Sequence, residues 1–242
     1  MADAHPNAQV TGIDLSPIQP AWTPPNCEFV IDDIEDDWAY PENHFDLIHI
    51  RCLMGSIKNW PRLYQQAYER AKPGGWVQHL DMSIMFTSDD GSVSGDHIMP
   101  QWSQTFIDCG EQIGKTFLIT SRASRLIREA GFEDVEEKWY KVPVGPWAKD
   151  KVCEAAKFLQ TDERDRRSDS GLPQNLKTIG FWNYHYCNSG AEGWALYLLT
   201  AVLGWPMESC QVFIAKFRDA LLDRKNHAYY NIAVVWGRKP LA

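Results

Sequence analysis

The 242-residue sequence lacks any excess of positive charge, because 24 Lys and Arg residues face 32 Asp and Glu residues, for a formal net charge of −8. This balance gives no general electrostatic basis for binding the phosphate backbone of DNA or RNA. Long apolar runs are also lacking: none approaches the length of about 18 residues that crosses a bilayer, and no signal-peptide-like segment opens the sequence. We therefore expect no direct nucleic-acid binding, no membrane insertion, and a cytoplasmic or nuclear location.

Metal and disulfide patterns are missing as well. The 6 cysteines are scattered, without a Cys-x-x-Cys pair and without the Cys/His spacing of a zinc site. No Ser/His/Asp arrangement stands out either. We expect reduced thiols, no disulfide framework and no bound metal.

The sequence does contain an alternation of short apolar strands and helical patterns. Strands are expected at 10–15, 27–33, 45–51 and 76–82, with a helix over 60–72 that a Pro-Gly-Gly turn ends. This alternation is typical of a parallel α/β sheet. Later in the chain, helices are expected at 98–114, 121–129, 151–160, 192–203 and 207–224, with strands at 132–145 and 229–240.

Two carboxylates follow neighbouring expected strands. Asp14 ends one strand and Asp33 ends the next, 19 residues later. Ligands of open α/β sheets bind at the carboxyl ends of the strands. Asp14 can accept both hydrogen bonds of a ribose diol, while Asp33 and the N–H of Ile34 can pair with an adenine edge. Asp14 alone is equally consistent with a turn or a helix cap, and Asp33 with a solvated acidic loop, but the two together favour a nucleotide-type site.

Several segments resemble class I S-adenosylmethionine-dependent methyltransferases, particularly the LaeA-like branch of filamentous fungi. They are IDLSPIQPAWTPPN, FVIDDIEDDW, FDLIHIR with GSIKNWPRLYQQAYERAKPGGW, VPVGPWAKD and HAYYNIAVVWGRKP. The resemblance implies a Rossmann-like α/β sheet with helices on both faces, an antiparallel C-terminal strand, and S-adenosyl-L-methionine as cofactor. It implies one domain over 1–242, with 1–82 a partial cofactor-binding half and 83–242 lid helices and a substrate-side half.

The resemblance also implies cofactor-binding positions. Ordered by the part of the cofactor that they face, these are Asp14 and Leu15 for the ribose, Asp33 and Ile34 for the adenine, and Arg51 and Cys52 for the methionine portion.

The sequence departs from the family pattern before the ribose acid. In the family a first strand and a Gly-x-Gly-x-Gly loop precede that acid by about 20 residues, whereas only MADAHPNAQ precedes Val10 here. We expect the first central strand to be missing between the strands that begin at Val10 and Phe45, in a truncated or degenerate member of the family. A protein partner or a second copy of the chain is then expected to cover the exposed sheet edge.

Catalytic residues are less evident. Methyl transfer needs an in-line approach to a sulfonium, so positioning can suffice without a base. His79 and Asp81 end the fourth expected strand and are weak candidates for a base, although His79 is equally consistent with a packed core histidine. His97, Tyr184 and His185 are looser candidates, and the aromatic stretch 181–187 is a candidate to cap a substrate pocket.

The expected activity is methyl transfer to a small molecule or a protein side chain, in a group linked to fungal secondary metabolism. One alternative is a non-catalytic descendant of the same fold that acts as a binding or regulatory module. Another is a nicotinamide-dependent dehydrogenase, since an acid after the second strand also serves NAD. That class, too, needs a glycine fingerprint before Val10.

Overall fold

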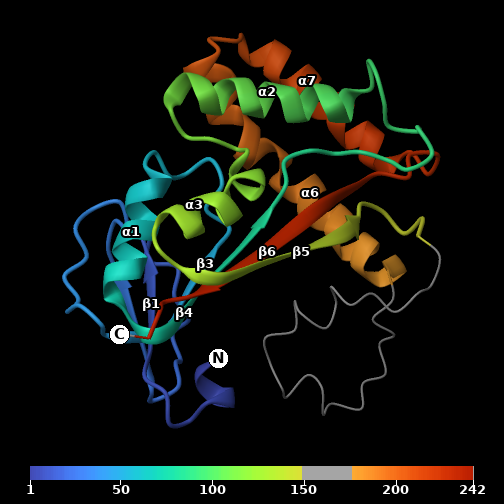
Figure 1. Cartoon of the computed structure of the whole chain (residues 1–242). Helices are drawn as coiled ribbons and strands as arrows, with labels where there is room; N and C mark the ends of the chain where they lie inside the picture. The colour runs from blue at the N-terminus through green and yellow to red at the C-terminus, as the bar shows by residue number, and fades with distance from the viewer. Residues whose placement is uncertain (149–175, 242) are drawn as a thin grey trace.

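The strands of the protein form two separate sheets (Figure 1). The computed structural model describes residues 1–148 and 176–241, so the helix expected at 151–160 lies outside the described residues. One sheet is the parallel pair of β1 (Val10–Asp14) and β2 (Cys27–Ile31). The other has four strands, in the order β3 (Phe45–Arg51), β4 (Ala71–Met82), β6 (Tyr229–Arg238) and β5 (Glu133–Pro143).

The four-stranded sheet is mixed. β3 and β4 run parallel, whereas β6 runs antiparallel to both of its neighbours, β4 and β5. The antiparallel C-terminal strand is therefore confirmed. Its residues Val234 and Val235 point to opposite faces and are almost fully buried, because helices cover both sides of the sheet there.

The sheet is interrupted between β1 and β3. Among the described residues, no strand pairs with the edge of β1 that is turned away from β2, or with the edge of β3 turned away from β4. The expectation that the first central strand is missing is confirmed.

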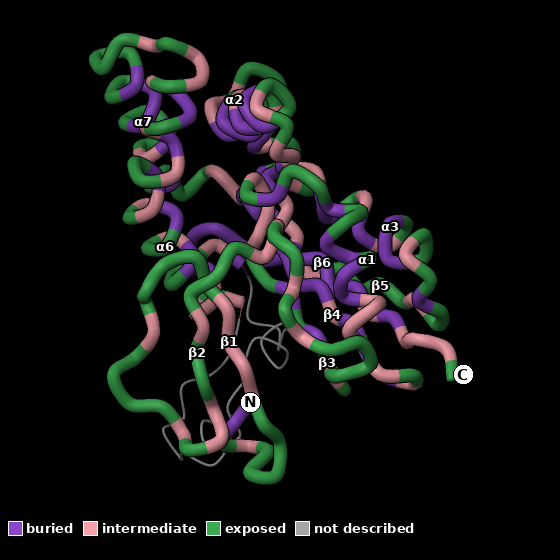
Figure 2. Tube along the Cα trace, turned by 90° about the vertical axis from the view of Figure 1, so that its left-hand side faces the viewer, coloured by how far each residue is buried: buried purple, intermediate pink, exposed green. Residues whose placement is uncertain are grey.

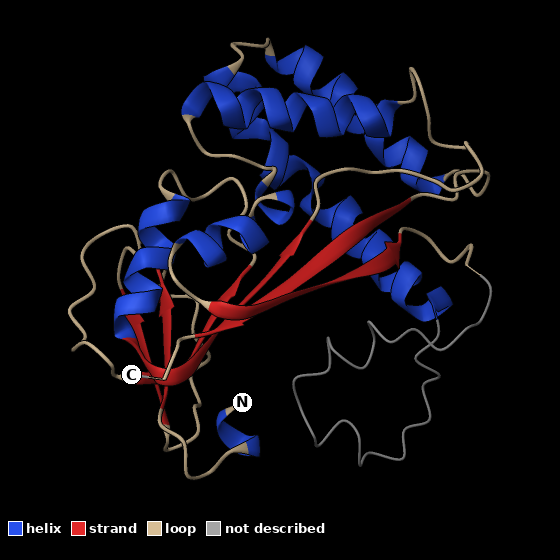
Figure 3. Cartoon of the chain, viewed as in Figure 1, coloured by secondary structure: helices blue, strands red, loops and turns tan. Residues whose placement is uncertain are grey.

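Helices lie on both faces of the larger sheet, as expected. α1 (Trp60–Arg70) and α3 (Ala123–Glu129) cover one face. On the other face α6 (Leu176–Tyr197) lies against β5, and α7 (Met207–Leu222) packs against both α6 and α2 (Ile98–Ile113) (Figure 3). Strand side chains alternate accordingly: Val77 and Val235 belong to the α1 core, whereas Leu80 and Val234 belong to the α6 core.

Helix α1 and strand β4 meet at a sharper boundary than the sequence indicates. The Asn59 side chain caps α1 by accepting from the N–H of Arg62 at 3.0 Å, with a proline in the first turn. The helix ends at Arg70 and β4 begins directly at Ala71, where the expected helix continued to 72. Ala71 pairs with Phe45 across an irregularity in the ladder, and Gly74 takes a φ of +78°.

Helix α6 differs most from expectation. It runs without a break through the aromatic stretch 181–187 and continues into a π-helix over Leu198–Val202, where only 192–203 was expected to be helical. Glycines and aromatic residues hide its apolar period. Tertiary packing stabilises it instead: the Asn183 amide donates to the carbonyl of Pro143 at 2.8 Å, which joins α6 to the end of β5.

The β1–β2 pair is poorly covered (Figure 2). Phe29 and Ile31 of β2 are 42% and 58% exposed, and Trp22 in the connection between the two strands is 92% exposed. This unit therefore has little hydrophobic core of its own.

No helix in the described part of the chain has the length and apolar character to cross a membrane. No group of three or more His, Cys, Asp or Glu side chains in the same residues is placed to hold a metal ion.

Candidate active site

A cavity of about 380 Å³ lies at the carboxyl ends of β3 and β4. Its walls come from the loop after β3, the segment after β4, α2 and α6. It is lined by Cys52, Met54, Gly55, Ser56, Asp81, Met82, Ser83, Ile84, Phe86, Trp102, Phe106, Phe117, Tyr186, Cys187, Gly193, Trp194, Tyr197, Leu198 and Tyr230. Strand ends of a parallel pair are where open α/β sheets place their ligands, so this cavity is the candidate active site.

A larger groove of about 600 Å³ lies elsewhere, between α1 and α3. Charged and amide side chains line it, including Arg62, Glu69 and Glu129. None of the site residues expected from the sequence borders this groove. We therefore assign the active site to the smaller cavity.

Asp81 fixes the wall that follows β3. Its side chain is 1% exposed, and its Oδ2 accepts from the N–H groups of Leu53 and Met54, both at 2.9 Å. Its Oδ1 accepts from the N–H of Met82 at 2.9 Å. Because both oxygens are occupied by backbone donors, Asp81 holds the loop in place and is poorly suited to abstract a proton.

His79 lies beside Asp81 but does not border the cavity. It is 2% exposed, its ring stacks on Trp60 with centroids 5.1 Å apart, and its Nδ1 lies 2.7 Å from the hydroxyl of Tyr64. Its Nε2 is 3.4 Å from Asp81 Oδ2. Burial, with a smaller contribution from Asp81, raises the pKa of Tyr64 well above its usual range. These contacts fit the alternative reading of His79 as a packed core histidine.

Cys52 directly follows β3 and has a backbone conformation that is unusual for a non-glycine residue. Its φ is +56°, and its N–H donates to the carbonyl of Leu80 at 3.1 Å. Partial burial and the nearby carboxylate of Asp81 raise the pKa of the Cys52 thiol. The thiol is therefore protonated at neutral pH and is a poor nucleophile. Arg51 precedes it and is exposed.

Gly55 explains how this loop can pass close to the aromatic wall. Its φ is +70°, and a Cβ built there would lie 2.4 Å from the ring of Phe117. Only glycine satisfies both the left-handed backbone and the close approach.

Asp14 and Asp33 are brought together, but on the smaller sheet. The N–H of Asp32 donates to the carbonyl of Asp14 at 3.2 Å, which places the ends of β1 and β2 side by side. Asp14 Oδ1 accepts from the N–H of Ser16, and Asp33 Oδ1 accepts from the N–H of Glu35, both at 2.9 Å. Among the described residues, one oxygen of each exposed carboxylate stays available to a ligand.

The neighbours of these acids differ in burial. Leu15 is 68% exposed, whereas Ile34 is half-buried against the α1 core and its carbonyl accepts from the indole N–H of Trp38 at 3.0 Å. Exposed carboxylates beside an apolar side chain fit the adenosine end of S-adenosyl-L-methionine. The nine residues before β1 contain no glycine, and Gly12 within β1 packs against the ring of Phe29. The described residues therefore provide no glycine-rich cradle for the methionine end.

The looser candidates have separate places. The ring of His97 caps α2, with Nδ1 accepting from the N–H of Met99 at 3.2 Å. Tyr184 and His185 lie on α6, where the His185 ring contacts Phe181 with centroids 4.6 Å apart. Neither Tyr184 nor His185 borders the cavity.

Sequence reasoning missed most of the cavity wall. Tyr186, Gly193 and Tyr197 of α6 all line it, at spacings of seven and four residues that fall on one helical face. That spacing is visible in the sequence, but it indicates a wall only once 176–197 is read as a single helix.

Comparisons with known proteins identify the family. A family model described as a methyltransferase domain matches residues 1–137. The chain is 34% identical over 241 residues to the methyltransferase pytC of Aspergillus terreus, covering 99% of this chain and 67% of that protein. It is 31% identical to the secondary metabolism regulator LAE1 of Cochliobolus heterostrophus, covering 99% of this chain and 72% of the relative.

A further relative has a more specific description. The protein-methionine methyltransferase laeA of Emericella nidulans is 28% identical over 247 residues, covering 100% of this chain and 59% of the relative. The chain thus spans from about three-fifths to about three-quarters of the length of these relatives. Because the family model matches more than half of the chain, and pytC is similar over nearly all of it, the chain belongs to the class I S-adenosylmethionine-dependent methyltransferases, with the LaeA-like fungal proteins as relatives.

Proposed function

We propose that this chain transfers the methyl group of S-adenosyl-L-methionine to an acceptor held in the cavity at the ends of β3 and β4. The observation that carries the proposal is the position of that cavity. It borders Cys52, which matches the family position facing the methionine portion, and it extends from there between α2 and α6.

The chain's own residues supply position rather than proton transfer. When bound, the cofactor provides an electrophilic methyl group on a sulfonium. Asp81 holds the loop that carries Cys52, and aromatic side chains exclude water from the cavity floor. Asp14 and Asp33 each offer one carboxylate oxygen to the adenosine. Placement of the acceptor in line with the methyl group is the principal means of acceleration in such a site.

Calorimetric titration with S-adenosyl-L-methionine, and with its demethylated product, tests the proposal. We expect binding by the full chain and a loss of about tenfold or more in affinity for Asp14→Ala, because a ribose diol loses its acceptor. Asp46→Ala is the matched control, because Asp46 is an exposed acid of β3 that forms an ion pair with Lys72 at 2.7 Å. No heat at millimolar ligand would contradict the proposal.

A second candidate is a binding or regulatory module of the same fold without catalysis. The split between β1 and β3 favours it, because unpaired strand edges are sites at which another chain can add a strand. A protein partner or a second copy is the proposed cover. Light scattering after gel filtration measures the copy number, and a monomer without cofactor binding would leave the partner-bound module as the remaining form.

The class of acceptor and the biological setting are further parts of the proposal. The relatives' descriptions as secondary metabolism regulators and as a protein-methionine methyltransferase support a role linked to fungal secondary metabolism, with a small molecule or a protein as acceptor. All five described cysteines are free, which supports a reducing compartment such as cytoplasm or nucleus. The dehydrogenase alternative is wrong, because the family is a methyltransferase family.

A further inference from the structure

We infer that the methyl acceptor is an uncharged, largely apolar small molecule that carries a planar ring. This inference rests on the proposed function and narrows its acceptor. It follows from three properties of the cavity wall: its charged groups, its hydroxyl groups and the shape that its aromatic rings give it.

Among the described residues, the cavity wall presents no charged group that a ligand can contact. None of its lining residues is Lys, Arg or His, and its only acidic side chain is Asp81. The Asp81 side chain is 1% exposed, and both of its oxygens accept from backbone N–H groups at 2.9 Å. An anionic acceptor would find no cation here, and a cationic one could not reach the buried carboxylate to form an ion pair. Burying either charge without a partner is costly.

The most deeply buried hydroxyl group of the cavity is already paired. The Tyr230 hydroxyl donates to Asn183 Oδ1 at 2.8 Å, and burial raises the pKa of Tyr230 well above its usual range, so this phenol stays neutral. Ser83 Oγ accepts from the N–H of Met85 at 3.2 Å and keeps its own O–H free to donate. The other hydroxyl groups of the wall belong to exposed residues, namely Ser56, Tyr186 and Tyr197. A ligand is therefore expected to be apolar where it contacts the buried rings and to place any polar group near these serines and tyrosines.

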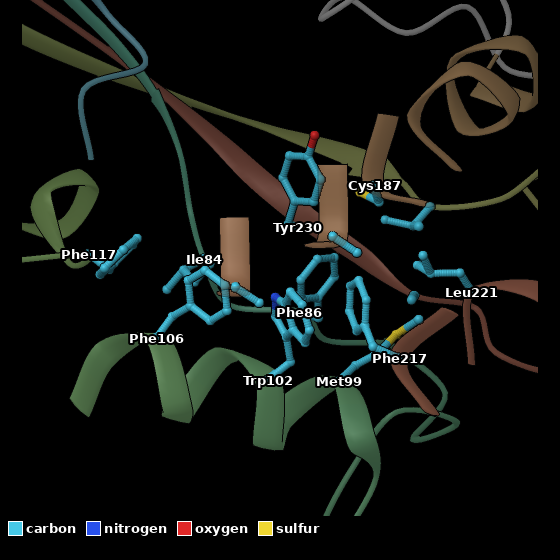
Figure 4. Close-up of a cluster of buried hydrophobic side chains, with 14 of the residues drawn as sticks. Ile84, Phe86, Met99, Trp102, Phe106, Phe117, Cys187, Phe217, Leu221 and Tyr230 are labelled. Carbon is cyan, nitrogen blue, oxygen red and sulfur yellow. The ribbon is translucent and has the colours of Figure 1, made fainter. Parts of the chain in front are cut away.

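The floor of the cavity is built from flat rings (Figure 4). Trp102 rises from α2 and stacks on Phe106, with centroids 4.9 Å apart and planes at 29°. Phe117 meets Phe106 edge-on at 5.5 Å. Figure 4 shows these rings packed together with Ile84 and Phe86 in one apolar cluster. Trp102 also stacks on Phe217, with centroids 4.0 Å apart, so the wall offers a planar apolar group mainly edge-on ring contacts.

Gly193 lines the cavity on the side of α6. It is exposed, and a Cβ built on it meets nothing within 4 Å. A large side chain at this position can therefore reach over the cavity without displacing the protein, and we expect it to obstruct a ligand there.

Equilibrium dialysis with 1-naphthol tests the inference, since this probe is a neutral planar ring with one hydroxyl. We expect it to bind the full chain, and we expect 1-naphthoate, the same ring with a carboxylate, to bind about tenfold more weakly or worse. Gly193→Leu should weaken 1-naphthol binding about tenfold or more by obstructing the cavity. Ser189→Leu is the control and should leave binding unchanged, because Ser189 is exposed one turn earlier on α6 and does not line the cavity.

Specific outcomes would overturn the inference. These are equal binding of naphthol and naphthoate, naphthol binding that Gly193→Leu does not weaken, or tight Gly193-dependent binding of a methionine-containing peptide in place of naphthol. Circular dichroism verifies that Gly193→Leu is folded. The S-adenosyl-L-methionine titration separates the two proposals: cofactor binding without naphthol binding overturns only the acceptor class, and naphthol binding without cofactor binding overturns only the proposed transfer.

Discussion

Asp81 illustrates how one residue can organise a site without taking part in proton transfer. Its carboxylate joins the end of β4 to the loop after β3 through hydrogen bonds to the N–H groups of Leu53 and Met54. In the sequence it is an acid at a strand end, which suggests a base. Only its burial and its three backbone donors identify it as a positioning residue.

We expect Asp81→Ala to lower the free energy of unfolding by about 3 kcal/mol, because it leaves three N–H groups without their acceptor. Urea denaturation followed by fluorescence measures the loss. Asp46→Ala is again the control and should change stability by about 1 kcal/mol or less, since its ion pair with Lys72 is exposed. Equal losses for the two variants would contradict the positioning role.

Asp90 makes a pH-dependent contribution to the stability of the folded protein. Hydrogen bonds from Ser92, followed by one from His227, hold the pKa of the Asp90 carboxyl well below its usual range. A carboxyl group whose folded pKa is depressed stabilises the protein above its unfolded pKa of about 4. This stabilisation is lost as the pH falls through the folded value.

We therefore expect the difference in urea midpoint between the wild type and Asp90→Asn to be larger at about pH 5 than at about pH 2. Ser92→Ala should lower stability with the same pH dependence, because it removes the Ser92 side chain, the largest cause of the lowered Asp90 pKa. The loss should be smaller than for Asp90→Asn, since the Ser92 N–H and His227 remain as partners of the carboxylate. A difference between wild type and Asp90→Asn that stays constant over this range would contradict the assignment.

At the scale of elements, two glycines of α6 have opposite surroundings. A Cβ built on Gly180 would lie 2.0 Å from the carbonyl oxygen of Gly145, where the helix touches the segment after β5. The N–H of Gly145 also donates to the carbonyl of Gly180 at 2.9 Å. Gly193 on the same helix faces the open cavity instead.

These surroundings predict opposite effects of the same substitution. Gly180→Ala should destabilise the protein by about 1–3 kcal/mol, because backbone must shift to admit the methyl group. Gly193→Ala should stabilise it by about 0.5–1 kcal/mol, since alanine restricts the unfolded chain and nothing obstructs its Cβ. Thermal unfolding of both variants measures the signs, and equal shifts would contradict the placement of α6.

At the scale of the whole molecule, the two sheets differ in how well they are supported. β4 and β6 lie between two helical layers, whereas β1 and β2 form an isolated pair with large apolar side chains exposed. A two-stranded sheet with little core is marginal alone.

Hydrogen exchange measured by mass spectrometry should therefore show faster exchange in β1 and β2 than in β4 and β6, by about tenfold or more, because local opening of the pair costs less free energy. Cofactor binding at Asp14 and Asp33 should slow exchange in β1 and β2 selectively. Equal protection of the two sheets without ligand would indicate that the pair is held by contacts stronger than those described.

Much of this architecture was predictable from local patterns. Strand periodicity located β1, β2 and β3, and the helical spacing of apolar residues located α1. The boundary at Ala71 and the length of α6 were not predictable, because cross-strand pairing sets the first and packing on β5 sets the second. The cavity wall from α6 was missed for the same reason.

The sequence by itself determined the family, the α/β class, the antiparallel last strand and the strand-end acids. Sequence motifs and the periodicity of apolar residues are local properties, and these features depend on them. Tertiary structure alone decided which of these features meet. It placed Asp81 and Cys52 at one aromatic cavity and left Asp14 and Asp33 on a separate sheet. Contacts across the fold depend on pairing and burial between segments far apart in the chain, and no local pattern encodes them.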